Sequence, residues 1–259
     1  MTDAPSASAL TGAPTDPAKG SLRILQLYPR EMNIYGDYGN VLVLKQRLAW
    51  RGYGAEILEH NAGDTLPEDV DIIIGGGGQD SGQVVIQDDL QAIAPRLREL
   101  AEDGVPMLLI CGLYQLFGRQ FRTHEGTVIP GIGVLDLETR GGSERLIGNV
   151  VATSEEFGEI HGYENHSGQT YLGPGVKPLA TVVKGEGNNA EDDHEGARYR
   201  NIVASYLHGS LLPKNPAIAD FLLRTAAERK FGSFDDDGLD ASLDALSELA
   251  RQHAGARPR

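Results

Sequence analysis

The sequence predicts an α/β fold, with a largely parallel central sheet, helices on both faces and added antiparallel strands. Short apolar runs alternate with amphipathic stretches through the first half of the chain. Such alternation favours parallel strands joined by crossover helices. Short Gly- and Thr-rich segments dominate the second half and are typical of antiparallel pairs. The 259 residues suffice for one large domain or two small ones.

The first half of the chain supplies four predicted strands, at residues 22–27, 55–59, 70–74 and 105–110. A helix whose apolar face includes Leu42, Leu44 and Leu48 follows the first strand. Asp37 stands where a side chain would cap the amino end of that helix. A second helix is predicted from about residue 86 to residue 102, just before the fourth strand.

The second half predicts shorter elements, with strands at 127–137, 146–153, 159–163 and 178–183. Turn residues separate these strands, so we expect antiparallel pairs added to the parallel sheet. The acidic, Asn- and Gly-rich stretch 184–195 predicts a solvated loop. A last strand at 202–207 precedes a capped helix at 216–229 and a short amphipathic helix at about 239–251.

Composition divides the chain into three parts. Residues 1–20 are rich in Ala, Pro, Thr and Ser without a hydrophobic period, which predicts a disordered leader. Residues 21–232 are expected to form one domain. Residues 233–259 are expected to supply an acidic linker, a short helix and a tail that frays from His253.

Charge and cysteine content exclude several classes of protein. The formal net charge of −14 argues against binding to nucleic acid or anionic lipid, because both require a basic surface. One cysteine excludes an intrachain disulfide framework and any zinc site with two thiolates. No run approaches the roughly 18 apolar residues that span a bilayer, and no signal-peptide pattern begins the chain. We therefore expect a soluble, cytoplasmic protein without membrane insertion.

Cys111, the only cysteine, stands where the fourth strand runs into a helix. The unpaired N–H groups and positive dipole end of a helix favour a thiolate, and the turn is built like a nucleophile elbow with Cys in place of Ser. Gly112 leaves room for a reacting carbonyl, so its N–H could donate to an oxyanion. The alternative is an inert core thiol, because free cysteines are among the most buried residues.

Two further features fall at predicted strand ends. Four glycines at 75–78 follow the third strand and let backbone amides approach a ligand, although they also suit a flexible turn. His208 follows the strand at 202–207. Together with Cys111 they supply oxyanion donors, a nucleophile and a general base, which thiol-based acyl transfer requires.

Several separated motifs resemble those of the class I glutamine amidotransferases, in the branch related to cobyric acid synthase. They are residues 33–40 (NIYGDYGN), 76–80 (GGGQD), 111–115 (CGLYQ), 145–149 (RLIGN) and 162–168 (GYENHSG). Within that branch the chain looks most like the GatD-type glutaminase subunit of lipid II isoglutaminyl synthase, over about residues 22–230. The resemblance implies a flavodoxin-like sheet and a glutamine amidotransferase domain over residues 21–232.

The resemblance implies catalytic roles for four residues. Cys111 would attack the side-chain amide of L-glutamine and form a thioester, while His208 would take and return the proton. Gly112 and a glycine of the preceding run, Gly76 in particular, would supply the oxyanion N–H groups. Many members carry a Glu two residues after the histidine, whereas Ser210 stands there in this chain. A Cys–His dyad, or a third group from elsewhere, is therefore implied.

Substrate-binding roles are implied for Arg145, Gln115, Glu164, Asn165 and His166. The planar guanidinium of Arg145 suits the α-carboxylate of glutamine, and the alternative is a surface ion pair. Glu164 and His166 are also a conceivable metal pair, but no further ligand stands at suitable spacing. We expect no metal, and we expect these two residues to lie in the substrate pocket or to fix a loop.

A separate partner is implied by what the chain lacks. No ATP-binding signature appears in it, so no cofactor is expected in this chain, and the ammonia produced needs a synthetase that accepts it directly. The resemblance implies a heterodimer with a Mur-ligase-like subunit of MurT type, which would bind ATP and magnesium. That partner would convert the D-glutamate of the lipid II stem peptide to D-isoglutamine. Two alternatives are another acceptor, such as a corrinoid carboxylate, and a non-catalytic amidotransferase-like scaffold.

Overall fold

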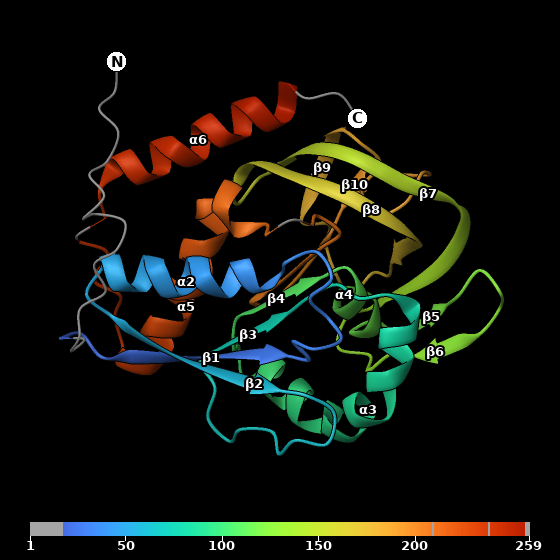
Figure 1. The fold of residues 1–259 in the computed structure, drawn as a ribbon, viewed down its shortest axis with the longest axis horizontal. Helices are drawn as coiled ribbons and strands as arrows, with labels where there is room; N and C mark the ends of the chain where they lie inside the picture. Colours follow the sequence, from blue (N-terminus) through green and yellow to red (C-terminus); the bar gives the residue numbers. More distant parts are fainter. Residues whose placement is uncertain (1–17, 209, 238, 257–259) are drawn as a thin grey trace.

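The computed structural model describes residues 18–208, 210–237 and 239–256. These residues include the predicted central sheet (Figure 1). Within these residues the sheet has six strands in the order β11-β12-β4-β3-β1-β2. All neighbours are parallel except β11, which is antiparallel to β12 at one edge. The strands are β1 Ser21–Leu27, β2 Gly54–His60, β3 Ile72–Gly75, β4 Met107–Ile110, β11 Ala197–Tyr199 and β12 Ile202–Ser205. The five parallel strands confirm the predicted ones.

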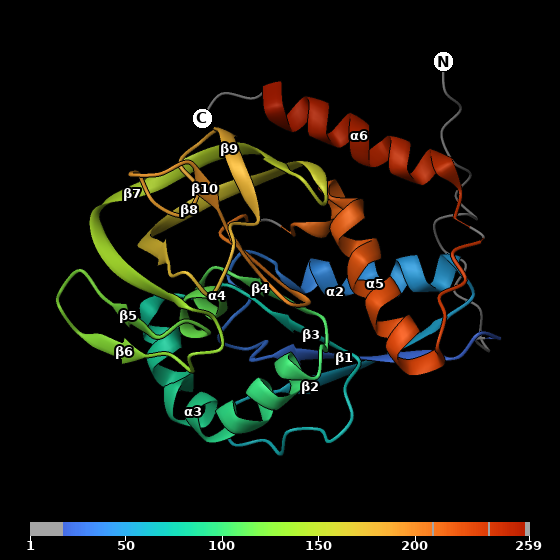
Figure 2. The same cartoon turned by 180° about the vertical axis from the view of Figure 1, so that it is seen from behind.

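Helices cover both faces of this sheet. Helices α2 and α5 lie on one face and α3 on the other, as the two opposite views show (Figures 1 and 2). Every residue of β3 and β4 is buried, as expected for parallel strands covered on both sides. The helices are α2 Tyr38–Trp50, α3 Asp80–Glu102, α4 Gly112–Leu116, α5 Pro216–Phe231 and α6 Ala241–Ala256, with the short 3₁₀ helix η1 at Leu212–Lys214.

Core packing on β4 predicts a large stability effect. Leu108 is fully buried, so Leu108→Ala is expected to lower the free energy of unfolding by about 2–5 kcal/mol, through lost apolar contact and a residual cavity. Leu42 on α2 is 47% exposed, so Leu42→Ala is a matched control expected to stay within about 0.5 kcal/mol of the parent. Urea unfolding measures both, and equal effects would contradict this packing.

Three details of the first two helices differ from the prediction. Asp37 precedes α2, but its backbone is helical and its side chain makes no capping bond; the carboxylate instead accepts the N–H of Gly77 at 2.9 Å. Leu42 faces outward rather than joining the apolar face. Helix α3 begins at Asp80, six residues before the predicted start. The prediction missed its first turns because they carry exposed side chains such as Val84 and so lack an apolar period.

The later strands form a second sheet, and only β11 extends the central one. The order of the second sheet is β10-β9-β7-β5-β6, and β8 also pairs with β7. Its neighbours are antiparallel except β5 and β7, which are parallel. The strand predicted over 127–137 is confirmed only at residues 128–130, because Pro130 and the glycines after it end β6. The other strands are longer than predicted where β7 and β8 pair. The bounds are β5 Gln120–Arg122, β6 Val128–Pro130, β7 Leu137–Ser154, β8 Gly158–Leu172, β9 Ala180–Lys184 and β10 His194–Glu195.

The stretch 184–195 is not the solvated loop that its polarity predicts. Asn188, Asn189 and Glu195 are fully buried. The Asn188 side chain donates to the carbonyl of Gly196 at 2.8 Å and accepts its N–H at 2.9 Å. Side-chain amides can thus replace water as partners for a buried backbone, so a polar composition does not require exposure.

Helix α6 packs above α2 and the β7–β8 pair (Figure 1). Arg47 of α2 and Arg51, just after this helix, hold this end of the chain through ion pairs with Asp220, Asp236 and Asp244. The helix continues to residue 256, so the fraying predicted from residue 253 is wrong up to that point. The rest of the predicted tail, and the leader up to residue 17, lie outside the described residues. None of the helices in the described part has the length and apolar character that crossing a bilayer requires.

Candidate active site

Cys111 occupies the predicted elbow between β4 and α4. Its backbone has φ 48° and ψ −99°, a conformation that costs energy for any residue with a Cβ. The neighbouring strand holds it there, because the Cys111 N–H donates to the carbonyl of Ser205 at 2.9 Å, and the Cys111 carbonyl accepts the N–H of Gln115 at the same distance. Such maintained strain is typical of functional sites.

The structure brings His208 to the same place. Strand β12 pairs with β4 in parallel, with Ser205 opposite Ile110, so both strands deliver their following residues to one edge of the sheet. A Cβ added at Gly77 would lie 3.0 Å from His208 Cε1 and 3.2 Å from Cys111 Cβ. The two side chains therefore flank one point on the glycine run.

His208 is buried beneath an aromatic ring. The ring of Tyr35 lies 4.0 Å from the imidazole, centroid to centroid, and neither ring nitrogen has a hydrogen-bond partner among the described residues. Burial, with the charges of His166 and Arg145, lowers the pKa of His208 to about 3. The Ser210 hydroxyl donates to the carbonyl of Gly36, and no carboxylate in the described part of the chain is hydrogen-bonded to the His208 ring.

Burial raises the pKa of the Cys111 thiol above its ordinary value, and the nearby carboxylate of Asp37 acts in the same direction. Arg145 and the Gly112 N–H oppose this rise in the pKa. Desolvation therefore outweighs the helix-terminus effect that the sequence predicts.

The member of the glycine run that lines the cavity is Gly78. Gly76 does not line the cavity, and a Cβ there would lie 2.0 Å from the carbonyl oxygen of Met32. The N–H of Gly77 is bonded to Asp37. Gly78 lies close to Gly112, since its nitrogen is 3.1 Å from a Cβ added at Gly112. Gly78 is therefore the glycine of the run that is best placed beside the elbow.

A cavity of about 340 Å³ opens beside Cys111. Four of the predicted substrate-binding residues line it, namely Gln115, Arg145, Asn165 and His166. Glu164 does not, because its buried carboxylate accepts the backbone N–H groups of Glu186 and Gly187. Glu164 therefore fixes the 184–195 loop, which is the second of its two predicted roles.

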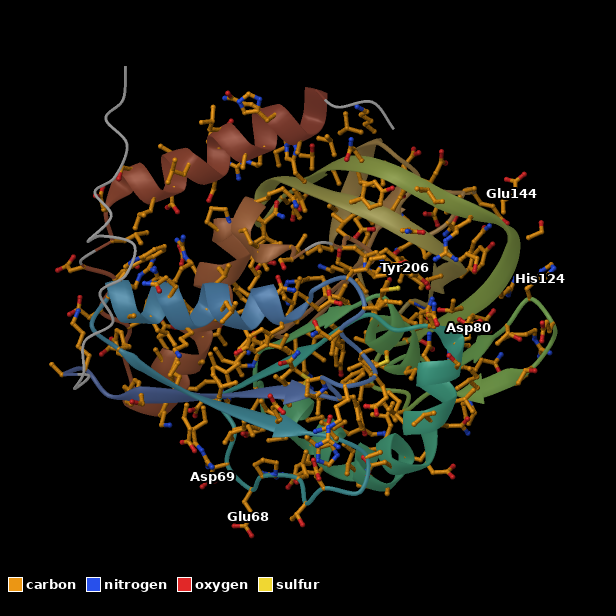
Figure 3. The ribbon with its side chains drawn as sticks, in the orientation of Figure 1. Glu68, Asp69, Asp80, His124, Glu144 and Tyr206 are labelled. Atoms are coloured by element: carbon orange, nitrogen blue, oxygen red, sulfur yellow. The ribbon has the colours of Figure 1, made fainter. Side chains whose placement is uncertain are left out.

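Arg145 presents its guanidinium to this cavity from β7. Its Nε donates to Asn165 Oδ1 at 2.6 Å, and one terminal nitrogen lies 3.4 Å from the hydroxyl of Tyr35. Asp80 at the start of α3 also lines the cavity, so a cation and a carboxylate face the same space. Figure 3 shows Asp80 near the bend of β7. This arrangement suits the two charges of an α-amino acid.

A polar network behind the cavity includes residues that the sequence did not single out. Gln83 donates to Gln115 at 2.9 Å, and Gln115 donates to the hydroxyl of Tyr206 at 3.0 Å. The Tyr206 ring stacks on His166 with centroids 3.7 Å apart. Gln83 falls on the apolar face of α3, three residues before Ile86, and a polar residue in that stripe was the signal available.

Acid is expected to destabilise the fold through its buried histidines. Burial lowers the pKa of His166 to about 4, against 6.5 for an ordinary histidine. Below pH 6.5 the unfolded chain therefore binds protons that the folded chain does not, and the free energy of unfolding falls toward pH 4. Urea midpoints from pH 7 to pH 4 measure this loss. His166→Gln should flatten it and the half-exposed His194→Gln should not; identical slopes in all three proteins would contradict it.

No group of three or more His, Cys, Asp or Glu side chains in the described ranges is arranged to hold a metal ion. The described chemistry of the cavity is instead that of a thiol, an imidazole, backbone N–H groups and a guanidinium.

Comparison with known proteins agrees with this arrangement. A sequence profile of the CobB/CobQ-like glutamine amidotransferase domain matches residues 23–216. The lipid II isoglutaminyl synthase (glutamine-hydrolyzing) subunit GatD of Staphylococcus aureus strain N315 is 40% identical over 220 residues, covering 85% of this chain and 90% of its own. The subunit of the same name from Streptococcus pneumoniae strain ATCC BAA-255/R6 is 37% identical over 242 residues, covering 92% of each chain.

More distant similarities point the same way. A probable cobyric acid synthase of Methanothermobacter thermautotrophicus is 30% identical and covers 74% of this chain and 41% of its own. A solved glutamine amidotransferase structure has a TM-score of 0.54 at 19% identity, covering 78% of this chain and 98% of its own, and shows the shared fold. The chain therefore belongs to the CobB/CobQ-like glutamine amidotransferase family.

Proposed function

We propose that this chain is the glutamine-hydrolysing subunit of an amidotransferase that amidates lipid II. The observation that carries the proposal is that Cys111 and His208 flank Gly77, beside a cavity that Arg145 also lines. A nucleophile, a base, oxyanion donors and an anion-binding guanidinium thus converge on one space. The similarity to two GatD subunits over most of the chain supports lipid II as the destination of the ammonia.

The reaction begins when a ring nitrogen of His208 takes the proton of the Cys111 thiol as the sulfur attacks the side-chain carbonyl of L-glutamine. The carbonyl oxygen becomes an oxyanion that the N–H groups of Gly78 and Gly112 stabilise. Collapse of this intermediate breaks the C–N bond, and the His208 proton passes to the leaving amine, which departs as ammonia. Water then attacks the γ-glutamyl thioester, with His208 again as base, and releases glutamate and the thiol.

Substrate binding gives Arg145 a testable role. Arg145→Ala is expected to raise the KM for glutamine about 10- to 100-fold, because a charge-assisted contact to the α-carboxylate is lost. The kcat should change much less, because Arg145 is assigned to binding the α-carboxylate and not to the bonds that Cys111 makes and breaks. Arg140 is an exposed arginine on the same strand that pairs with Glu138 instead, and Arg140→Ala is the matched control. Steady-state glutaminase kinetics measure both; an unchanged KM in Arg145→Ala would remove this assignment.

The ammonia requires a partner. Ammonia is mostly protonated near neutral pH, so a synthetase must receive it before it reaches bulk water. We propose a heterodimer with a Mur-ligase-like, ATP-dependent subunit of MurT type, in which ATP and magnesium are bound. That subunit would activate the α-carboxyl of D-glutamate in the stem peptide, and ammonia would convert it to D-isoglutamine. A catalytic thiol favours a reducing compartment, so we propose that the reaction takes place in the cytoplasm.

Purification of the chain with its partner tests this function. The complex should convert glutamine, ATP and a muropeptide precursor to the amidated precursor and glutamate. The similarity to a cobyric acid synthase makes a corrinoid carboxylate the second candidate acceptor. Amidation of a corrinoid acid and not of the muropeptide would favour that candidate. No glutamine hydrolysis with either acceptor would favour a scaffold without catalysis.

A further inference from the structure

Gln83 is a buried polar side chain for which the proposed mechanism has no use. It is 1% exposed and lines the same cavity as Cys111. It lies at the reacting end of the cavity, because a Cβ added at Gly112 would be 3.4 Å from Gln83 Nε2 and 3.1 Å from the nitrogen of Gly78. Gln83 therefore lies beside Gly112 and close to Gly78, the two residues assigned to the oxyanion.

A chain of hydrogen bonds sets the orientation of the Gln83 amide. Gln83 Nε2 donates to Gln115 Oε1, and Gln115 Nε2 in turn donates to the Tyr206 hydroxyl. The Tyr206 oxygen is also bonded to Thr170 Oγ1 at 2.6 Å, so the chain is anchored in β8. Tyr206 is itself fully buried, and its position is labelled in Figure 3.

The carbonyl oxygen of the Gln83 amide, by contrast, lacks a partner. Gln83 Oε1 is buried and has no hydrogen-bond partner among the described residues. A buried acceptor without a partner is costly, and native structures rarely keep one without a reason. Because Gln83 lines a substrate cavity, this oxygen can accept a hydrogen bond from a donor group of the ligand.

We infer that Gln83 Oε1 accepts an N–H of the scissile carboxamide and makes the site specific for an amide over a carboxylate. The inference rests on the proposed function. With the substrate carbonyl oxygen held by Gly78 and Gly112, the –NH₂ group is the part left for a neighbouring acceptor. Glutamate presents a carboxylate oxygen at that position, and two acceptor oxygens repel. Gln83 thus selects glutamine and disfavours the retention of glutamate.

Binding without turnover tests the inference. In the Cys111→Ala protein, isothermal titration calorimetry gives the affinities for L-glutamine and L-glutamate. Adding Gln83→Met keeps the length of the side chain and removes its carbonyl. The glutamine affinity is expected to fall about tenfold, the value of one buried hydrogen bond, and the glutamate affinity to change less than about twofold. Gln83→Leu is made in parallel, so that the ratio of the glutamine and glutamate affinities can still be measured if Gln83→Met does not fold.

Gln115→Met is the matched control, because it breaks the same Gln83–Gln115 bond and leaves the Gln83 carbonyl in place. It should change both affinities by a similar factor and keep their ratio. An equal loss of both ligands in the Gln83 variants, or a larger loss of glutamate, would overturn the inference. A Cys111→Ala parent that binds no glutamine would instead overturn the proposed function, so the two failures are distinguishable.

Discussion

Cys111→Ala is expected to abolish glutamine hydrolysis and to leave ammonium-dependent amidation by the complex intact. Without the sulfur no γ-glutamyl thioester forms, so kcat should fall by about 10⁴-fold or more. The fold should persist, because alanine keeps the Cβ and the backbone bonds that hold the elbow to Ser205. Glutamate release measures the first reaction. Amidation with ammonium chloride in place of glutamine measures the second.

The pair of assays separates catalysis from structure. Hydrolysis at the parent rate in Cys111→Ala would contradict the role of the thiol. Loss of both reactions would show that the substitution damages the complex. Cys111→Ser supplies a second variant of nearly the same shape, whose hydroxyl is a far weaker nucleophile at neutral pH.

His208→Gln is expected to lower kcat by about 10²–10⁴-fold, because the imidazole that flanks Gly77 together with Cys111 is no longer there to move the proton. The KM should change little, since His208 is assigned to proton transfer and not to binding the charged groups of glutamine. His161 is also buried but is bonded to Glu159 in the β7–β8 region, and His161→Gln is the matched control. Steady-state kinetics measure both. A kcat of His208→Gln within about twofold of the parent would contradict the role of the imidazole.

The parallel sheet was predictable because its strands are apolar on both faces. Residues 72–74 and 107–110 are uninterrupted apolar runs, and they lie in the fully buried strands β3 and β4. The start of α3 was not predictable, because Val84 and Val85 are exposed and no period marks its first turns. The loop at 184–195 was predicted, but the burial of Asn188 was not, because it depends partly on the hydroxyl of Tyr114, which is distant in the sequence and donates to the Asn188 side chain.

The position of the site was predictable for a topological reason. Cys111 and His208 each follow a parallel strand, and parallel strands deliver their carboxyl ends to one edge. Which glycine lines the cavity depends on backbone geometry that the sequence does not contain, and it is Gly78 rather than Gly76 that does so. The raised pKa of the Cys111 thiol was likewise not predictable, because it follows from burial and from the proximity of Asp37.

Mass spectrometry of the intact protein, after reaction with a glutamine-analogue electrophile, tests most directly whether Cys111 is a nucleophile served by His208. One adduct is predicted, mapped to Cys111, prevented by excess L-glutamine and formed more slowly in His208→Gln. A Cys111 that stays unmodified, or that reacts equally fast with and without the imidazole, would contradict the dyad.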